Sequence, residues 1–252
     1  LPMIGSPDAY MLECYALLSA LARETSTIRL SSLVTGNTYR NPAVLAKTIT
    51  TLDIVSEGRA ELGIGAGWFE LEHSSFGIEF GTFTDRFEKL DEALQIILPM
   101  LRGERPTLDG KWYQVVDAMN EPPPVRRIPV MIGGGGEKKT LKFVARYADD
   151  SNLICAVDEV PRKLAALDEH CGAEHRDRST ITVTRQQATC IAPTFEEARS
   201  ELDTTLAARG LTGEQLDLAR SLVVHGDPDT VGEQMAAQLE LGLDGFTVNA
   251  VA

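Results

Sequence analysis

Hydrophobic side chains recur along the chain with two spacings, one typical of amphipathic helices and one typical of β-strands. Residues 82–102 carry apolar side chains at helical spacing, from Phe83 and Phe87 through to Leu101, and residues 8–24 show the same spacing. Between the helical stretches lie β-rich runs at 27–34, 59–64, 128–132, 151–156, 180–191 and 244–250. Strands that alternate with helices predict a mainly parallel sheet covered by helices.

Cap and turn residues mark the ends of several predicted elements. Asn41 followed by Pro42 is typical of a helix N-terminus, and Gly58 stands where that helix should end. Pro99 is expected to kink or end the long helix of residues 82–102. The Asp-Gly pair and the three consecutive prolines within residues 103–128 predict a hairpin followed by an extended linker.

The length of 252 residues suits a single (β/α)8 barrel domain over residues 1–252, because such barrels usually have about 250 residues. A closed barrel of this kind has eight strands, whereas the pattern supplies six. Residues 212–226 are predicted to be helical and then irregular, so they add no strand to this number.

Charge and cysteine content narrow the classes of function. The net charge is −13 and there is no run of basic residues, which argues against a nucleic-acid surface. No apolar segment is long enough to cross a membrane and no signal peptide is visible. The four cysteines form no CxxC pair and no metal-like spacing, so we expect a cytoplasmic protein without a metal site.

Two glycine-rich turns follow predicted strands. The Gly63-x-Gly65-x-Gly67 turn lacks the GxGxxG spacing of a dinucleotide-binding turn, and residues 68–80 are not predicted to open a helix. We therefore expect Gly65 and Gly67 to let a flat ligand lie close to the backbone, because glycine has no Cβ.

The second turn, Gly133, Gly134, Gly135 and Gly136, leads into a predicted helix. Its backbone N–H groups and the helix dipole predict a phosphate site, assisted by Lys138, Lys139 or Thr140. The alternative is a flexible turn whose glycines only allow tight packing.

Other polar residues have weaker signals. Ser31, Ser32, Thr35 and Asn37 place polar groups at the end of the strand of residues 27–34, although, taken alone, an ordinary polar loop with a helix cap explains them better. His73 belongs to no metal motif and is interpreted as a surface or loop-anchoring histidine.

Taken together, these motifs resemble the luciferase-like monooxygenase superfamily, and within it the oxidoreductases that use the deazaflavin coenzyme F420. The resemblance rests on residues 31–80, 86–97, 129–152 and 226–249, which occur in the family's order. It implies a (β/α)8 barrel with an insertion at the carboxyl ends of the strands, to which the hairpin of residues 103–128 is assigned. It also implies a deazaflavin across the mouth of the barrel.

The resemblance assigns roles to particular residues. "SLVT" matches the segment that bulges behind the ring, often with a non-proline cis peptide, which would lie at Ser32–Leu33 with Thr35 nearby. "GGGGEKKT" matches the loop that takes the cofactor phosphate. Trp68 stands where some relatives carry an acidic glutamate, and because an indole cannot supply that proton, Trp68 is expected to form a wall for the ring or the substrate.

The family has two strands and a helix before the segment that matches Leu1. Its second strand usually ends in a catalytic polar residue, so the resemblance implies that the main proton donor lies upstream of Leu1. The sequence favours a homodimeric F420-dependent oxidoreductase that transfers a hydride between the deazaflavin and a small organic substrate. The alternatives are an FMN-dependent monooxygenase and a degenerate barrel that binds a flavin without turnover.

Overall fold

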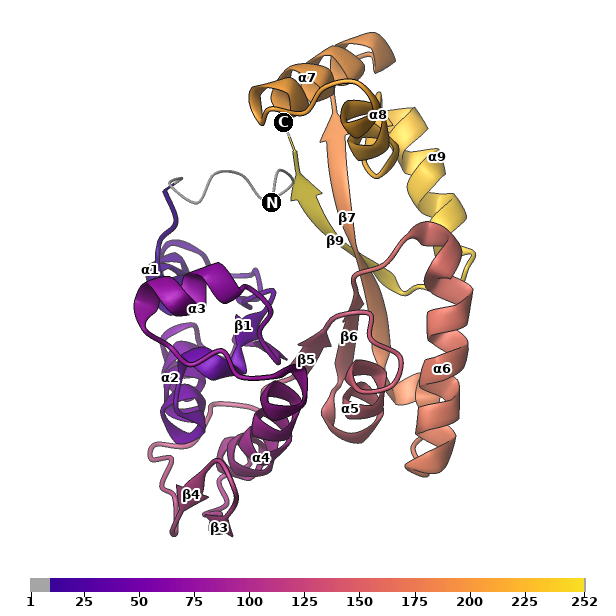
Figure 1. The fold of residues 1–252 in the computed structure, drawn as a ribbon. Helices are drawn as coiled ribbons and strands as arrows, with labels where there is room; N and C mark the ends of the chain where they lie inside the picture. The colour runs from indigo at the N-terminus through magenta and orange to yellow at the C-terminus, as the bar shows by residue number, and fades with distance from the viewer. Residues whose placement is uncertain (1–9, 252) are drawn as a thin grey trace.

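The computed structural model describes residues 10–251, which form a parallel sheet with helices packed along it (Figure 1). The strands are β1 (Thr35–Gly36), β2 (Leu62–Gly65), β3 (Leu108–Asp109), β4 (Gln114–Val115), β5 (Val130–Gly133), β6 (Asp150–Leu153), β7 (Thr182–Ile191), β8 (Val224–Gly226) and β9 (Gly245–Ala250). The helices are α1 (Cys14–Glu24), α2 (Pro42–Val55), α3 (Glu70–Phe76), α4 (Phe83–Leu101), α5 (Thr140–Tyr147), α6 (Val160–Ala173), α7 (Phe195–Ala208), α8 (Glu214–Ser221) and α9 (Pro228–Leu239).

The sheet runs in the order β1-β2-β5-β6-β7, and every pairing in it is parallel. β7 is ten residues long and carries β6 and then β8 along one side, while β9 pairs along the other. An isolated bridge between Leu30 and Ala60 extends the β1–β2 pairing. Within residues 10–251 the outer edges of β1 and β9 pair with no further strand, so this part of the sheet is a curved, open arc.

The parallel α/β architecture predicted from the sequence is confirmed. Three local predictions are wrong. Residues 224–226, expected to be irregular, form β8. Residues 70–76, where no helix was expected, form α3. The run of residues 27–34 contributes only the bridge at Leu30, and the paired strand β1 begins at Thr35.

Alternate residues of the central strands β2 and β5 face the helices and belong to the main core. Leu62 and Ile64 of β2 and Ile132 of β5 are essentially unexposed. They pack with residues of the surrounding helices in one hydrophobic cluster, to which α2, α4, α5 and α6 contribute (Leu45, Ile49, Leu90, Leu94, Leu141, Val144 and Leu167, among others). Burying aliphatic side chains of this size stabilises the fold by roughly 1.5–3 kcal/mol each.

A smaller hydrophobic cluster lies at the far end of β7. Cys190 and Val251 pack there with Leu202 and Leu206 of α7 and with Val223, which follows α8. Figure 1 shows α7 and α8 at the top of the molecule, away from the helices of the main core. The long β7 thus connects two separately packed regions.

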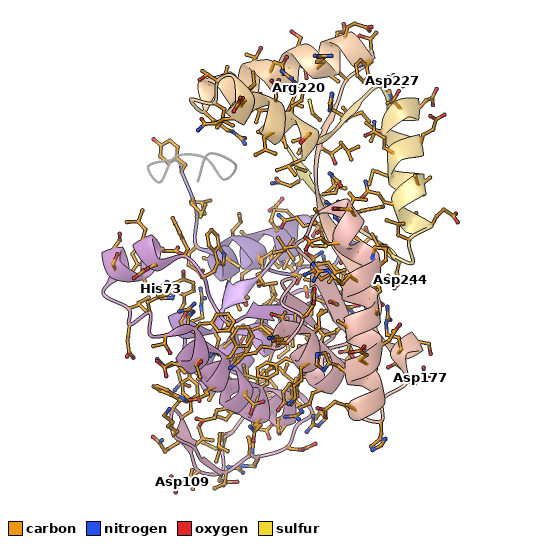
Figure 2. The ribbon with its side chains drawn as sticks, turned by 45° about the vertical axis from the view of Figure 1, so that its right-hand side comes forward. His73, Asp109, Asp177, Arg220, Asp227 and Asp244 are labelled. Atoms are coloured by element: carbon orange, nitrogen blue, oxygen red, sulfur yellow. The ribbon has the colours of Figure 1, made fainter. Side chains whose placement is uncertain are left out.

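The hairpin β3–β4 lies at the amino-terminal ends of the strands, so its assignment to an insertion at their carboxyl ends is wrong. The reason is topological: α4 returns from the carboxyl edge to the amino edge of the sheet, and the hairpin follows α4. Figure 2 places Asp109 of the hairpin at one end of the molecule and Arg220 and Asp227 at the other. The hairpin is held along α4 by Glu92, whose carboxylate accepts the backbone N–H groups of Lys111, Trp112 and Tyr113 at 2.8–2.9 Å.

Candidate functional site

The parallel register brings the predicted site residues to one edge of the sheet. Gly36 is the register partner of Gly65, and Gly133 that of Asn152. The segments that follow β1, β2, β5 and β6 therefore start side by side at the carboxyl edge, where parallel α/β sheets bind ligands.

The segment of residues 31–34 bulges over the inner face of the sheet, opposite the helices. The Ser32 hydroxyl donates to the carbonyl oxygen of Gly63 at 3.0 Å and lies 3.4 Å from the Tyr15 hydroxyl. The cis peptide bond lies between Leu33 and Val34, one residue beyond the predicted position at Ser32–Leu33. Leu33 is 44% exposed, whereas Ser32 and Val34 are turned into the fold.

The glycines of β2 and β5 make room for this bulge, which for Gly65 is a different role from the close ligand approach expected of it. A Cβ added to Gly63 would lie 1.8 Å from the carbonyl oxygen of Ser32. A Cβ on Gly65 or Gly133 would lie 3.0 or 2.9 Å from a methyl group of Val34. Val34 therefore fills the space above these glycines, and a flat ligand at this edge would rest on the bulge.

The glycine loop after β5 lies close against the end of β6 and the segment that follows it. The N–H of Gly134 donates to the Asn152 carbonyl at 2.9 Å and its φ is +130°, a conformation that favours glycine. A Cβ on Gly135 would lie 2.6 Å from the carbonyl oxygen of Ile154. A turn over residues 137–139 then leads into α5, whose N-terminal dipole favours an anion.

Charged residues around this loop are arranged in two groups. Glu137 is paired with Lys163, at 2.8 Å, and with Arg162, and the Lys163 ammonium holds the pKa of Glu137 below its usual range. Lys139 lies over the rings of Phe83 and Phe87 at 5.9 and 5.6 Å. Lys138 is exposed, so of the residues expected to assist an anion it is the one whose side chain extends from the loop.

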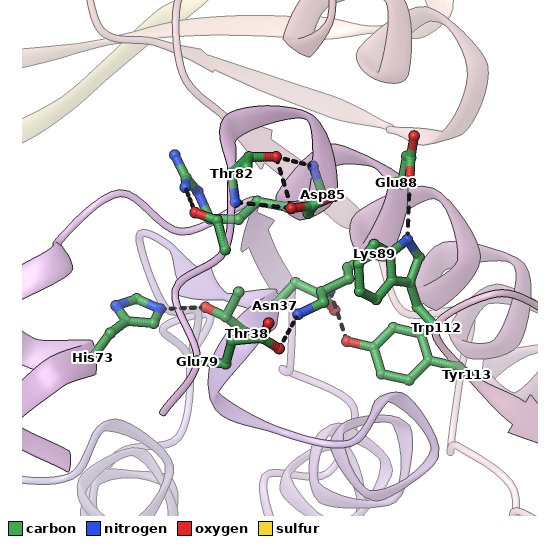
Figure 3. Close-up of polar contacts among 12 residues, drawn as sticks. Asn37, Thr38, His73, Glu79, Thr82, Asp85, Glu88, Lys89, Trp112 and Tyr113 are labelled. Carbon is green, nitrogen blue, oxygen red and sulfur yellow. Dashed lines mark hydrogen bonds and ion pairs between the residues drawn. The ribbon is translucent and has the colours of Figure 1, made fainter. Parts of the chain in front are cut away.

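The buried His73 anchors the loop between β2 and α3. Its Nε2 lies 2.7 Å from the Thr38 hydroxyl (Figure 3), and its Nδ1 lies 2.7 Å from the Phe69 carbonyl oxygen. A carbonyl oxygen can only accept, so Nδ1 carries a proton. The loop-anchoring interpretation of His73 is thus confirmed, while a surface position is wrong because the side chain is unexposed.

Tyr39 stacks on the imidazole of His73, with ring centroids 4.6 Å apart, and donates its hydroxyl to Glu72. Burial, followed by the hydrogen bond to Glu72, raises the pKa of Tyr39. Thr38, Tyr39, Glu72 and His73 thus form a closed network in which both imidazole nitrogens are in use.

Arg86 of α4 fixes the same loop from its other side. Its guanidinium donates to the carbonyl oxygens of Gly67, at 3.1 Å, and Gly81, at 3.0 Å, and lies 3.8 Å above the Phe80 ring. Two further predicted site residues differ in exposure. Trp68 is 60% exposed at the edge of the sheet, whereas Thr35 is buried and its hydroxyl accepts a hydrogen bond from Arg40. Trp68 can contact a ligand, whereas the Thr35 hydroxyl serves the fold.

Sequence reasoning missed a polar cluster on the inner face. Asn152 of β6 is unexposed, and its amide nitrogen donates to Thr184 of β7 and Thr247 of β9, both at 2.8 Å. Its carbonyl oxygen Oδ1 has no partner within residues 10–251. The three residues are up to 95 positions apart, so only the register of the strands brings them together.

A comparison with family models identifies the chain. Residues 3–245 match the model described as luciferase-like monooxygenase. The chain belongs to the luciferase-like monooxygenase family. The resemblance seen in the sequence is thus confirmed.

Relatives and solved structures agree with this membership of the luciferase-like family. A protein of Microbacterium testaceum named F420-dependent glucose-6-phosphate dehydrogenase is 28% identical over 247 residues, which cover 89% of this chain and 73% of that protein. A Nocardia farcinica protein of the same name is 28% identical over 93% of this chain and 76% of its own length. An F420-dependent secondary alcohol dehydrogenase, solved with an F420–acetone adduct, superposes with a TM-score of 0.85 at 18% identity, covering 98% of this chain and 81% of that one. The F420-dependent tetrahydromethanopterin reductase of Methanopyrus kandleri gives a TM-score of 0.81 at 19% identity, over 95% and 82% of the two chains.

Residues 10–251 lack two kinds of feature. No group of three or more histidine, cysteine, aspartate or glutamate side chains there could hold a metal ion. Among the helices of that stretch, each is too short or too polar to traverse a bilayer.

Proposed function

We propose that this luciferase-like protein is an oxidoreductase that binds coenzyme F420 at the carboxyl edge of its sheet and acts on a small organic substrate. The observation that carries the proposal is the glycine loop of residues 133–136, which leads through one turn into α5 beside the bulge of residues 31–34. The names of the relatives support F420 over other cofactors. When bound, F420 supplies a hydride carrier at C5 of its deazaflavin.

The residues of the loop fit a phosphate-bearing cofactor. Gly135 and Gly136 have no room for a Cβ, which would lie 2.6 Å from the Ile154 carbonyl oxygen and 2.9 Å from the Thr140 hydroxyl respectively, so the loop needs glycine at these positions and carries no side chain of its own over its backbone there. Its N–H groups and the dipole of α5 would bind the phosphate, and Lys138 would add a positive charge. Glu137 does not oppose this, because Lys163 and Arg162 neutralise it.

The ring system would lie on the bulge, with Gly133, Gly134 and Gly65 behind it. Leu33 is the exposed apolar side chain of the bulge and would support the ring from behind, with Trp68 forming one side wall. Arg86 and His73 keep the loop that carries Gly67 and Trp68 in place. The chain's own contribution is then to orient the ring and to keep water from the reacting face. Ser32 supports the bulge through its hydrogen bond to Gly63.

A fluorescence titration tests the proposal directly. Purified protein is titrated separately with F420 and with FMN, and turnover is then followed on a panel of alcohols and sugar phosphates, chosen because the relatives are named for such substrates. We expect F420 to bind at least tenfold more tightly than FMN. Tighter binding of FMN would favour the flavin-dependent monooxygenase, and F420 binding without turnover on any member of the panel would favour the non-catalytic barrel.

A matched pair of glycine variants localises the site. Gly135→Ala forces the loop away from Ile154 and should weaken F420 binding roughly tenfold or more, since one charge-assisted hydrogen bond contributes about 1.5–3 kcal/mol. Gly172→Ala, in α6 with open space around it, should leave binding unchanged. Equal F420 affinities of the two folded variants would remove the glycine loop from the site.

A further inference from the structure

A cavity lies on the outer face of the sheet, on the opposite side from the bulge. It has a volume of about 590 Å³ and is bordered by β7, the start of α6, the end of α8, and α9. In Figure 1 these elements lie on the right of the molecule, with α6 and α9 one above the other beside β7. A volume of this size is within the range of sites for small organic molecules.

A buried cation, Arg185 of β7, lines this cavity. The residue is 6% exposed. Its Nε donates to the Cys155 carbonyl oxygen at 3.0 Å, and its Nη1 donates to the side-chain oxygens of Gln187 and, at 3.0 Å, Gln238. Both glutamines are themselves more than nine-tenths buried.

The partners of Arg185 are all neutral. Across residues 10–251 no ion pair involves Arg185, and its hydrogen bonds there come from Nε and Nη1 and none from Nη2. A buried charge is costly unless it is paired, because burial removes its hydration. Two buried glutamines hold the guanidinium of Arg185 in position, and its Nη2 keeps its hydrogen-bond donors available beside the cavity. This arrangement suits an anionic ligand.

The other lining residues indicate which anion fits. Val157, Pro161, Leu222 and Leu241 give the cavity apolar walls. Asp158 also borders it and adds a negative charge. A dianionic phosphate would be repelled by Asp158 more strongly than a singly charged carboxylate, and the planar carboxylate matches the planar guanidinium.

We propose that this cavity is a binding site for a small organic monocarboxylate, whose carboxylate pairs with Arg185 and whose apolar part lies against Val157, Pro161 and Leu222. The site is separate from the proposed F420 site, since Arg185 shares the outward-facing side of β7 with the core residue Val183. The inference therefore stands whether or not F420 is the cofactor.

Ligand-observed NMR and thermal denaturation test the site with defined probes. Butyrate and benzoate are the test ligands, butanamide and benzamide are uncharged controls of the same shape, and inorganic phosphate is the dianionic comparison. We expect the carboxylates to bind and to raise the melting temperature, while the amides do neither. Arg185→Met should weaken carboxylate binding roughly tenfold or more, and Ser221→Trp, which narrows the rim from its exposed end, should weaken it with Arg185 in place.

Arg29→Met, an exposed arginine whose contact with Glu61 is long at 3.4 Å, is the matched control and should bind as the unaltered protein does. If Arg185→Met does not fold, the Ser221→Trp result decides. Stronger binding of phosphate than of either carboxylate would overturn the assignment to a monocarboxylate. Equal effects of carboxylates and amides, or carboxylate binding that survives both substitutions, would show that Arg185 has only a structural role.

Discussion

The contact between Gly63 and the bulge can be tested by adding one methyl group. In Gly63→Ala the new Cβ would lie 1.8 Å from the Ser32 carbonyl oxygen, where an ordinary contact needs more than 3 Å. The bulge must therefore retreat by more than 1 Å, because the obstructing atom belongs to the backbone and cannot rotate away. The retreat also breaks the hydrogen bond from the Ser32 hydroxyl to Gly63.

The expected cost follows from these two effects. Overpacking of a close contact costs about 1–3 kcal/mol, and loss of a buried hydrogen bond about 1 kcal/mol. We therefore expect Gly63→Ala to lower the free energy of unfolding by roughly 2–4 kcal/mol, which for a chain of this length is a fall in melting temperature of roughly 4–16 °C.

Urea denaturation at 25 °C provides the measurement, with two alanine controls. Gly65→Ala places its methyl 3.0 Å from the rotatable side chain of Val34 and should cost less than Gly63→Ala. Gly172→Ala adds its methyl to open space within α6 and should stabilise the protein by about 0.5–1 kcal/mol. A Gly63→Ala variant as stable as the Gly65→Ala variant would refute the packing of Ser32 against β2.

Three further outcomes are expected. Burial and its hydrogen bond to Asp91 raise the pKa of Tyr147 to about 12. The protonated Tyr147 should therefore stabilise the fold below pH 10, and this contribution should be lost as the pH rises towards 12. Absorbance at 295 nm should show a late tyrosine ionisation that Tyr147→Phe removes. Glu92→Gln should cost roughly 1–3 kcal/mol and speed amide exchange at residues 111–113; unchanged exchange there would show that the carboxylate does not hold the hairpin. Arg86→Met should make the loop between β2 and α4 sensitive to limited proteolysis with little loss of global stability, and equal cleavage of both proteins would count against its anchoring role.

Features encoded by nearby residues were predictable from the sequence. The N-cap Asn41 was recognised from the local signal, and in the structure its side chain accepts the N–H groups of Ala43 and Val44. The long helix of residues 82–102 also formed as its apolar spacing predicts, with Pro99 in its last turn.

Features that depend on residues far away in the sequence could not be predicted from it. β8 is three residues long and exists through its pairing with the end of β7. α3 starts at Glu70 after Phe69, whose side chain cannot cap it, so its N-terminus has no capping signal and only Gly77 at its other end marks it in the sequence. Gly63 looked like part of a ligand-binding turn, because the Ser32 carbonyl group that requires a glycine there lies 31 positions earlier in the chain. The burial of Arg185 likewise depends on Gln238, which is 53 positions away.

The separate cluster at the far end of β7 has a consequence for the dynamics of the molecule. Cys190, Leu202, Leu206 and Val223 are buried against one another and not against the main core. A region with its own core can open as a unit while the rest of the sheet stays paired, as subglobal unfolding units do. Native-state hydrogen exchange should therefore detect one cooperative opening that includes α7, α8 and β8, at a lower free energy than global unfolding. In natural variation, this peripheral unit is then the part of the molecule that can change size or be rebuilt with least effect on the proposed F420 site beside β1, β2 and β5.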